Sequence, residues 1–465
     1  MKLIECMEGQ VGKYAALSHC WGDPKDMERA KTTKENYHDR LHSIPYIDLP
    51  NSFRDATRIT RELGLQYLWI DSLCIIQDDA SDWQHESTKM TATYENAFIT
   101  LAATASSGCK EGIRTSHKRA RHFPNFSVRP APNLGYLQQQ PLFQRGWTLQ
   151  EIILSPRVVH FADDELYLVC RSFTMSHDGH NLGPGTAVAN LHSPPGRLSH
   201  NVWWNWVEDY SRRLLTYPQD KLPALAGLTQ KFQQQTGATP AVGLWTDDLH
   251  YGLLWWPTTV TSRPQDVSFI PTWSWTSVDG AVKQLCRREE MEHGYMSNYL
   301  RPAKIVPTST LTLSWDGEPL TSEISEGTLH IKGRLKSLPS GLQAPVKDDL
   351  KSLRARMPSN PDEILSHRDP QYIIENEDLR LHLFLDEKSK PIENSNSGDS
   401  VWWCLEMTTM IGTPRRNWFL ILRHIGSTRA GMAQYQRLGV GYIGRNFKYK
   451  SCWFEGLQMQ EVLLV

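Results

Sequence analysis

The pattern of apolar and polar positions between residues 53 and 105 predicts two helices that alternate with two strands. Ser52 and Asp55 resemble a capping box at the start of the first helix, and Gly64 ends its pattern. The positions that repeat at helical spacing between them are Phe53, Ala56, Thr57, Thr60 and Leu63. We therefore expect a helix that packs one face on a sheet.

Residues 67–70 form a short, continuous apolar run between turn-type residues. Such a run predicts a strand that is covered on both faces, as in a parallel sheet. Asp71, Ser72 and Cys74 then leave the carboxyl end of this strand. Because ligands of open α/β sheets bind beyond the carboxyl ends of the strands, we expect these three residues to line a site.

The second helix should begin at an N-cap at Ser81 or Asp82 and bring another carboxylate towards the same edge. Its apolar face contains Trp83, Met90, Tyr94 and Ala97. Glu86 lies at the margin of that face, about 60° from Trp83. Spacing alone favours a partly exposed carboxylate that interacts with the helix dipole, and the alternative is a carboxylate of a site.

Residues 14–18 predict the first strand of the chain, and a His19-Cys20-Trp21-Gly22 turn follows it. The carboxyl end of this strand should lie beside Asp71. His19 and Cys20 are adjacent on an extended chain and point in opposite directions. They are therefore not expected to act together as base and nucleophile.

Residues 143–154 predict a short helix that carries Arg145, Gln150 and Glu151, and residues 157–161 and 165–170 predict a hairpin. If the helix residues meet Asp71 and Glu86, the cluster could bind the hydroxyl groups and phosphates of a nucleotide. The alternative is a buried ion pair, such as Arg145 with Glu86 or Glu151, that fixes the packing of two helices. The sequence does not separate these two interpretations.

The expected domains are an α/β domain at residues 1–172, a linker at 173–200, and an α+β domain at 201–465. In the last domain we expect helices up to residue 236 and mainly antiparallel strands from about residue 273. His177 and His180 in the linker lack a third ligand at convincing spacing, so we interpret them as ordinary linker residues and expect no metal site.

Charge and cysteine content exclude several classes of protein. The 465 residues include 50 basic and 51 acidic side chains, which gives a formal net charge of −1 and no support for nucleic-acid binding. The basic group at residues 118–122 is expected to be a solvated surface. The eight cysteines are scattered without a C-x-x-C pair, and no apolar run is long enough for a signal or a membrane span. We expect a soluble, cytoplasmic protein without required cofactors.

Three segments resemble, in order, the blocks of the HET (heterokaryon incompatibility) domain of filamentous fungi. They are YAALSHCWG at residues 14–22, the block at 53–105, and RGWTLQE with SPR at 145–157. The resemblance implies an effector of self/non-self recognition and programmed cell death, which self-associates or binds another incompatibility protein. It also implies a ligand site made of Ser18, Trp21, Gly22, Ser72, Cys74, Arg145, Trp147, Gln150 and Glu151.

HET domains have been considered distant relatives of TIR domains, several of which cleave NAD with a glutamate on a helix. This similarity implies that Glu86 is a catalytic carboxylate, that Asp71 assists it, and that NAD is a substrate. The chain lacks G-x-x-x-x-G-K-[ST] and G-x-G-x-x-G, so no separate nucleotide-binding module is expected. The alternative is an interaction module without enzymatic activity, in which the motif residues are structural.

Overall fold

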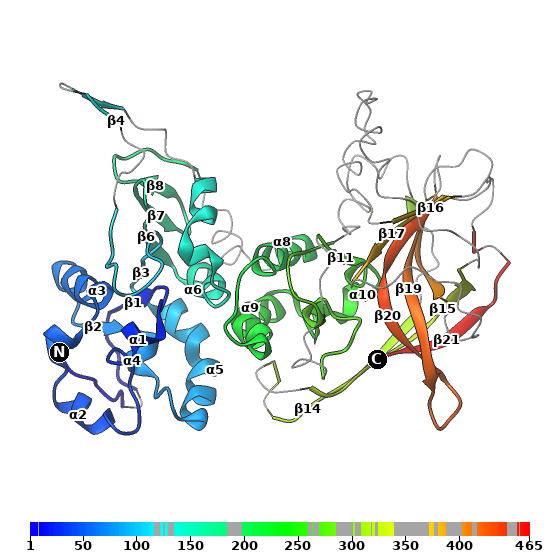
Figure 1. Cartoon of the computed structure of the whole chain (residues 1–465), viewed down its shortest axis with the longest axis horizontal. Helices are drawn as coiled ribbons and strands as arrows, with labels where there is room; N and C mark the ends of the chain where they lie inside the picture. Colours follow the sequence, from blue (N-terminus) through cyan, green and yellow to red (C-terminus); the bar gives the residue numbers. More distant parts are fainter. Residues whose placement is uncertain are drawn as a thin grey trace. The chain divides into compact units, whose positions relative to one another are not determined.

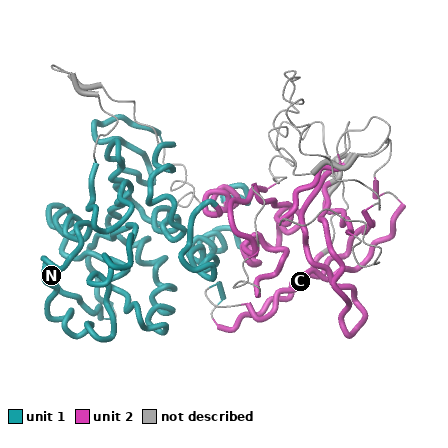
Figure 2. Tube along the Cα trace, viewed as in Figure 1, with its two compact units in different colours: residues 1–202, 212–237, 319–321 teal, residues 203–211, 238–318, 322–465 magenta. Residues whose placement is uncertain are grey.

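The structure is a computed structural model that divides into two compact units, coloured separately in Figure 2. The first unit contains residues 1–202, 212–237 and 319–321, and the second contains 203–211, 238–318 and 322–465. We expected the second domain to begin at residue 201, but residues 212–237 cluster with the first unit because they pack on its helices. The described residues are 1–7, 9–115, 121–123, 126–128, 134–183, 198–258, 263, 269–284, 301–302, 308–317, 319–320, 324–338, 372–375, 380–386, 402–411, 416–443, 453–454 and 456–465.

A mixed sheet of six strands forms the centre of the first unit (Figure 1). The strand order is β2-β1-β3-β6-β7-β8. The strands β2, β1, β3 and β6 are parallel to one another. The bounds are β1 Tyr14–Ser18, β2 Tyr67–Trp69, β3 Ile99–Ala102, β6 Arg157–Phe161, β7 Leu166–Cys170 and β8 Thr174–Ser176. The predicted pairing of the first two strands is confirmed, since Ala15 lies opposite Leu68. The predicted hairpin of β6 and β7 is confirmed as well.

Helices pack against this sheet. Helix α3 contributes Phe53 and Ala56 to a buried cluster that also contains Ala15 and Leu17 of β1. Tyr94 of α5 donates a hydrogen bond to the carbonyl of Leu17, and α6 also contacts β1. The α-helices among the described residues of the unit are α1 Pro24–Met27, α2 Tyr37–His42, α3 Asn51–Glu62, α4 Asp71–Cys74, α5 Ala80–Asn96, α6 Thr148–Leu154 and α9 Ala226–Thr236. The 3-10 helices are η1 Tyr46–Asp48, η2 Leu134–Gln139, η3 Pro141–Gln144, η4 Pro218–Lys221 and η5 Pro223–Leu225, and β4 Arg121–Phe123 pairs with β5 Phe126–Val128.

Two expectations about the ends of helices are wrong. The N-cap of α3 is Pro50, and Ser52 is buried inside the helix without a capping bond, because Asp55 accepts instead from the backbone N–H of Ile113 at 2.9 Å. The N-cap of α5 is Asp79, whose side chain accepts from the N–H groups of Ser81 and Asp82. In α3, a contact with a distant segment occupies the Asp55 carboxylate. In α5, a carboxylate earlier in the chain accepts from the first N–H groups of the helix.

The expected burial of β2 on both faces is also wrong. Strand β2 is the edge of the sheet, and all three of its residues are only half-buried. An apolar run is compatible with an edge position when other segments shield part of the strand. The predicted helix at 143–154 is divided, because η3 ends at Gln144 and α6 begins at Thr148.

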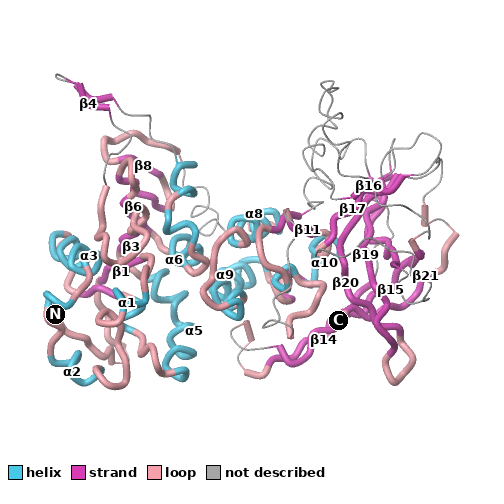
Figure 3. Tube along the Cα trace, viewed as in Figure 1, coloured by secondary structure: helices cyan, strands magenta, loops and turns pink. Residues whose placement is uncertain are grey.

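Strands dominate the second unit (Figure 3), as expected. Its main sheet has nine strands, with antiparallel pairing except between β20 and β21. They are β13 Arg301–Pro302, β14 Thr308–Trp315, β15 Ile324–Ser337, β16 Tyr372–Glu375, β17 Arg380–Leu385, β18 Trp402–Ile411, β19 Arg416–Ser427, β20 Ala433–Ile443 and β21 Met459–Leu464. Two small sheets add β9 Pro240–Ala241 with β10 Leu244–Trp245, and β11 Trp255–Pro257 with β12 Val282–Gln284. The helices are η6 Thr246–Asp248, α10 Leu249–Gly252 and η8 Trp275–Ser277, and most of α8 His200–Tyr210 belongs here.

Buried tryptophans and one buried arginine organise the core of the second unit. Trp255 and Trp273 are fully buried, and the Arg437 guanidinium lies 3.5 Å from the centre of the Trp255 ring. The same guanidinium donates to the carbonyls of Leu253 and Trp255 and to both oxygens of Asp386. Each of the three guanidinium nitrogens therefore donates to an acceptor, which offsets the cost of burying the charge.

Several sequence features lie outside the described residues: basic residues 118–120, linker residues 184–197, Cys286 and Cys452. The cysteines within the described ranges are free thiols. A search of the described helices found none with the length and apolar character that a membrane span requires.

Candidate functional site

Asp71 lies where the sequence predicts a site, directly after β2 at the carboxyl edge of the parallel strands. Its Oδ2 accepts a hydrogen bond from Trp21 Nε1 at 2.8 Å, and its Oδ1 accepts from the N–H of Ser72 at 2.7 Å. Parallel pairing of β1 with β2 accounts for this contact, since it brings the turn after β1 beside the end of β2. Trp21 thus holds the carboxylate in one orientation.

Gly22 shapes the turn that carries Trp21. Its φ is +80°, and a Cβ there would approach Gly108 Cα to 2.7 Å. Only glycine combines this backbone conformation with such close contact between two chain segments. In the structure, Gly22 therefore has a conformational role. Its contact with Gly108 sets the position of the neighbouring Trp21 indole.

Arg145 joins this group from the segment between η3 and α6. Its Nη2 is 3.6 Å from Asp71 Oδ2, its guanidinium lies 5.4 Å from the centre of the Trp21 ring, and its Nη1 donates to the carbonyl of His19. Burial alone would lower the pKa of Arg145, but the carboxylates of Asp71 and Glu151 raise it above its ordinary value. Arg145 is therefore a fixed cation at the centre of the cluster.

Glu151 of α6 is the most deeply buried acid of the group, with 1% of its surface exposed. Burial raises the pKa of Glu151 to about 7, and Asp71 adds to this effect, whereas Arg145 and the hydroxyls of Ser18 and Tyr94 oppose it. Among the described residues, Glu151 Oε2 has no hydrogen-bond partner. The carboxyl group can therefore exchange a proton near neutral pH without leaving its place.

His19 contributes a buried ring to the same region. Its Nδ1 is 3.9 Å from Asp71 Oδ1, and neither ring nitrogen makes a hydrogen bond within the described part of the chain. Burial lowers the pKa of His19 to about 4, although the Asp71 charge acts in the opposite direction. The imidazole is therefore neutral at physiological pH. We call Asp71, Arg145, Glu151, His19 and Trp21 the Asp71 cluster.

Two expected ligand residues, Gln150 and Trp147, point towards the segment 212–237 instead. Gln150 Oε1 accepts from the N–H of Gly227 at 3.3 Å, and Trp147 Nε1 donates to Asp220 Oδ2 at 3.2 Å. The Trp147 ring also packs edge-to-face on Trp83 at 6.3 Å. These contacts attach α6 to the following helices within the first unit.

Glu86 lies beside the Asp71 cluster without joining it. Its carboxylate is 21% exposed and forms an ion pair with Lys89 at 2.9 Å. In the described ranges it has no hydrogen bond or ion pair with any member of the cluster. The Cys74 thiol interacts electrostatically with both regions: its pKa is raised to about 12, chiefly by burial, with smaller contributions from the charges of Asp71 and Glu86.

The remaining expected residues are in or next to the cluster. The Ser18 hydroxyl is buried beside Glu151, and the Ser72 hydroxyl donates to the carbonyl of Ala30 at 3.2 Å. Sequence reasoning did not include His19 and Tyr94 in the site. The apolar spacing of α5 assigned Tyr94 to the core, and His19 was considered only as a partner of Cys20. Its position directly after β1 was the signal that could have identified it.

Comparison with known proteins assigns the same region to a family. Residues 14–151 match the family described as "Heterokaryon incompatibility protein (HET)". The vegetative incompatibility protein HET-E-1 of Podospora anserina is 24% identical over 160 residues, which are 34% of this chain and 10% of that protein. The chain thus matches only about a tenth of the length of this relative. No solved structure matches the chain. Residues 14–151, which contain the whole Asp71 cluster, are therefore similar to the heterokaryon incompatibility (HET) family.

Proposed function

We propose that this protein is an effector of heterokaryon incompatibility, which acts in the cytoplasm after fusion of unlike fungal cells and leads to programmed cell death. Two findings support the proposal. The match to the HET family spans every member of the Asp71 cluster, and the relative in Podospora anserina is itself called a vegetative incompatibility protein. Self-association or binding of another incompatibility protein would bring the domain into its active arrangement.

Our proposal for the chemistry is cleavage of a nicotinamide dinucleotide, in the manner of TIR domains. Arg145 would hold the pyrophosphate, because a guanidinium binds phosphate oxygens through two parallel hydrogen bonds. Glu86 would face the ribose, where loss of nicotinamide creates positive charge that a carboxylate stabilises. Water adds its hydroxyl to the ribose carbon, nicotinamide leaves with the electron pair of the broken bond, and one proton is released.

The observation that carries this proposal is the incomplete pairing of buried polar groups at the carboxyl edge of the sheet. Glu151 Oε2 and both nitrogens of His19 are buried without hydrogen-bond partners among the described residues, and both side chains interact electrostatically with the Arg145 cation. Buried polar atoms without partners are costly, and a bound polar ligand removes that cost. The Glu86 side chain is 21% exposed, so a ligand can reach it.

NAD consumption by concentrated purified protein tests the chemistry. We expect Glu86→Gln to reduce the rate by at least about a hundredfold, as for loss of a group that stabilises transition-state charge. Lys89→Met is the matched control, since it breaks the same ion pair but keeps the carboxylate. If Glu86→Gln and Lys89→Met consume NAD equally well, Glu86 has no role in the reaction.

A second candidate function is an interaction module without enzymatic activity. The partners of Asp71 favour this candidate. Its carboxylate already interacts with Trp21, Ser72 and Arg145, as expected for a carboxylate in a structural ion pair. Titration of the wild-type chain with NAD separates the two candidates. Absence of binding and of turnover at every protein concentration would support the interaction module.

Growth of a fungal host that expresses the full chain tests the effector role independently of NAD. We expect reduced viability with the wild type and relief with Asp71→Asn, because the neutral amide weakens the contact with Arg145. Glu62→Gln, at the exposed end of α3, is the control at equal expression. Normal growth with wild-type protein would contradict an autonomous effector.

A further inference from the structure

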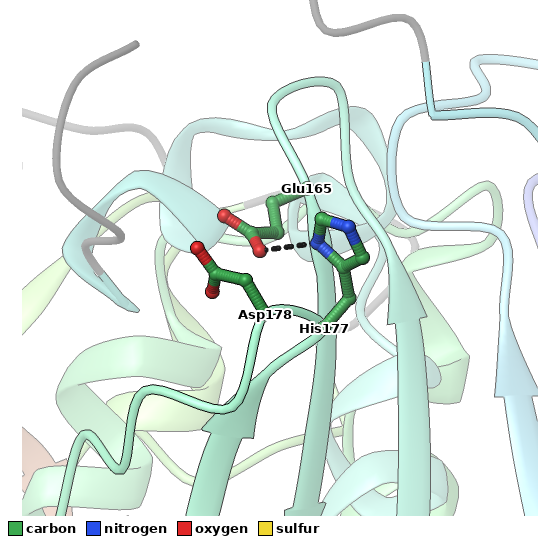
Figure 4. Close-up of side chains that lie close together, drawn as sticks. All are labelled: Glu165, His177 and Asp178. Atoms are coloured by element: carbon green, nitrogen blue, oxygen red, sulfur yellow. Dashed lines mark hydrogen bonds and ion pairs between the residues drawn. The ribbon is translucent and has the colours of Figure 1, made fainter.

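A second group of polar side chains meets at the far edge of the six-stranded sheet (Figure 4). Glu165 precedes β7, and His177 and Asp178 follow β8, so the antiparallel pair β7–β8 brings them together. One ligand atom from each residue lies within 4.8 Å of the other two, and His177 Nδ1 is 2.6 Å from Glu165 Oε1. These residues lie beyond the segment that matches the HET family.

The backbone that carries the three side chains is held by its own hydrogen bonds. The N–H of His177 donates to the carbonyl of Leu166, and the N–H of Ser176 donates to the carbonyl of His180, both at 3.0 Å. Gly179 closes the turn between them with φ of +86°, a conformation that favours glycine. The positions of the three residues are therefore set before any ligand binds.

The side chains are also oriented. Glu165 is buried with 2% exposure, and its carboxylate points to the imidazole of His177. Asp178 Oδ1 accepts from the Ser176 hydroxyl at 2.5 Å, which directs Oδ2 to within 3.6 Å of His180 Nε2. The carboxylates of Glu165 and Asp178 and the imidazole of His177 thus lie close together.

We propose that Glu165, His177 and Asp178 bind a divalent transition metal of the zinc class, with water as the fourth ligand and His180 as an outer partner of Asp178. Imidazole nitrogens together with carboxylates suit Zn²⁺, whereas Ca²⁺ and Mg²⁺ prefer oxygen ligands alone. Ligand atoms about 2.0–2.2 Å from a tetrahedral zinc are roughly 3.4 Å apart. The observed spacing allows this geometry after small side-chain rotations, in which the metal replaces the proton between His177 and Glu165.

The metal would join the turn before β7 to the end of β8, the last strand of the sheet. His177 and His180 were expected to be ordinary linker residues because no third ligand was visible in their sequence neighbourhood. Glu165 supplies that ligand from an adjacent strand. The inference is independent of the Asp71 cluster and of NAD chemistry.

Calorimetric titration of the full-length, EDTA-treated protein with Zn²⁺ alone tests the site, and Co²⁺ absorption reports its geometry. We expect one equivalent to bind, with Co²⁺ bands of a tetrahedral site. Loss of an outer hydrogen-bond partner already costs about 10–100-fold in metal affinity, so His177→Ala and Glu165→Gln should each cost at least tenfold. His180→Ala should also weaken binding by about tenfold.

Two controls keep the test decisive. His85→Ala removes an exposed histidine of α5 and should leave Zn²⁺ affinity unchanged. Asp178→Asn keeps the size of the side chain and, with unchanged circular dichroism, should still lower affinity. Absence of saturable Zn²⁺ binding by the wild type, or Zn²⁺ affinities of Glu165→Gln and His177→Ala equal to that of the wild type, would overturn the proposal.

Discussion

At the scale of single residues, Glu151 couples the protonation of the Asp71 cluster to stability. Its pKa rises from an ordinary value of 4.5 to about 7 on folding, chiefly through burial. Between these pH values the folded protein binds the proton more strongly than the unfolded chain does. Stability from this group is therefore complete below about pH 4.5 and is lost as pH rises through about 7.

The predicted loss between pH 5 and pH 8 is about 3 kcal/mol in the free energy of unfolding. Glu151→Gln should remove this part of the pH dependence, which urea unfolding of both proteins at pH 5, 6.5 and 8 measures. His19 and His160 act in the opposite direction, since burial lowers their pKa values to about 4 and 3 and costs stability below about pH 6.5. The variant retains both histidines, so the difference between the two curves isolates Glu151. Parallel curves would contradict the raised pKa.

Arg437 gives a second prediction at this scale. Burial lowers its pKa to about 10, yet Asp386 and two carbonyls keep it charged. Arg437→Met should destabilise the second unit by about 3–5 kcal/mol, because it leaves the buried Asp386 without its main partner. Arg437→Met with Asp386→Leu should recover much of that loss in the same unfolding experiment. A double variant less stable than the single one would contradict this explanation.

At the scale of elements, the loop after β1 depends on contact between Gly22 and Gly108. Gly22→Ala introduces left-handed strain and a clash with backbone, so we expect a loss of roughly 2–4 kcal/mol in unfolding free energy. Gly64→Ala is the matched control, because its φ is +71° but no atom lies within 4 Å of the added Cβ. It should cost only about 1 kcal/mol. Equal losses in thermal unfolding would show that the Gly22 contact has no role.

The sequence predicts elements well where one local pattern decides them. The parallel pairing of β1 and β2 and the β6–β7 hairpin follow from apolar runs and turn residues. Sequence patterns fail where a residue far along the chain determines the local structure. The N–H of Ile113 donates to the Asp55 carboxylate, so the expected capping box does not form. The site follows the same rule. The strand ends predict the position of Asp71, whereas its contact with Arg145 was one of two open interpretations, and the position of Glu86 depends on its ion pair with Lys89.

At the scale of the whole molecule, the residues that match the HET family are not a complete structural unit. Arg213 Nη1 donates to Thr148 Oγ1 at 2.9 Å, Gly227 binds Gln150, and Lys231 pairs with Glu95. A chain that ends at residue 202 loses all three contacts with α5 and α6. We expect it to unfold at lower urea concentration than the first unit does in the intact chain, as followed by hydrogen exchange of β1 and β3. Equal protection of these strands in both would contradict the prediction.

The position of Arg145 has a consequence for protein synthesis. The cation of the Asp71 cluster and its supports at residues 212–237 emerge from the ribosome after β1, β2 and β3 have been made. Domains fold as units during translation, so the cluster lacks these supports while the later residues are still within the exit tunnel. If the cluster is the active site of an effector, a truncated nascent chain would be harmless to the cell that makes it. Nonsense mutations before residue 212 would then protect the host rather than poison it.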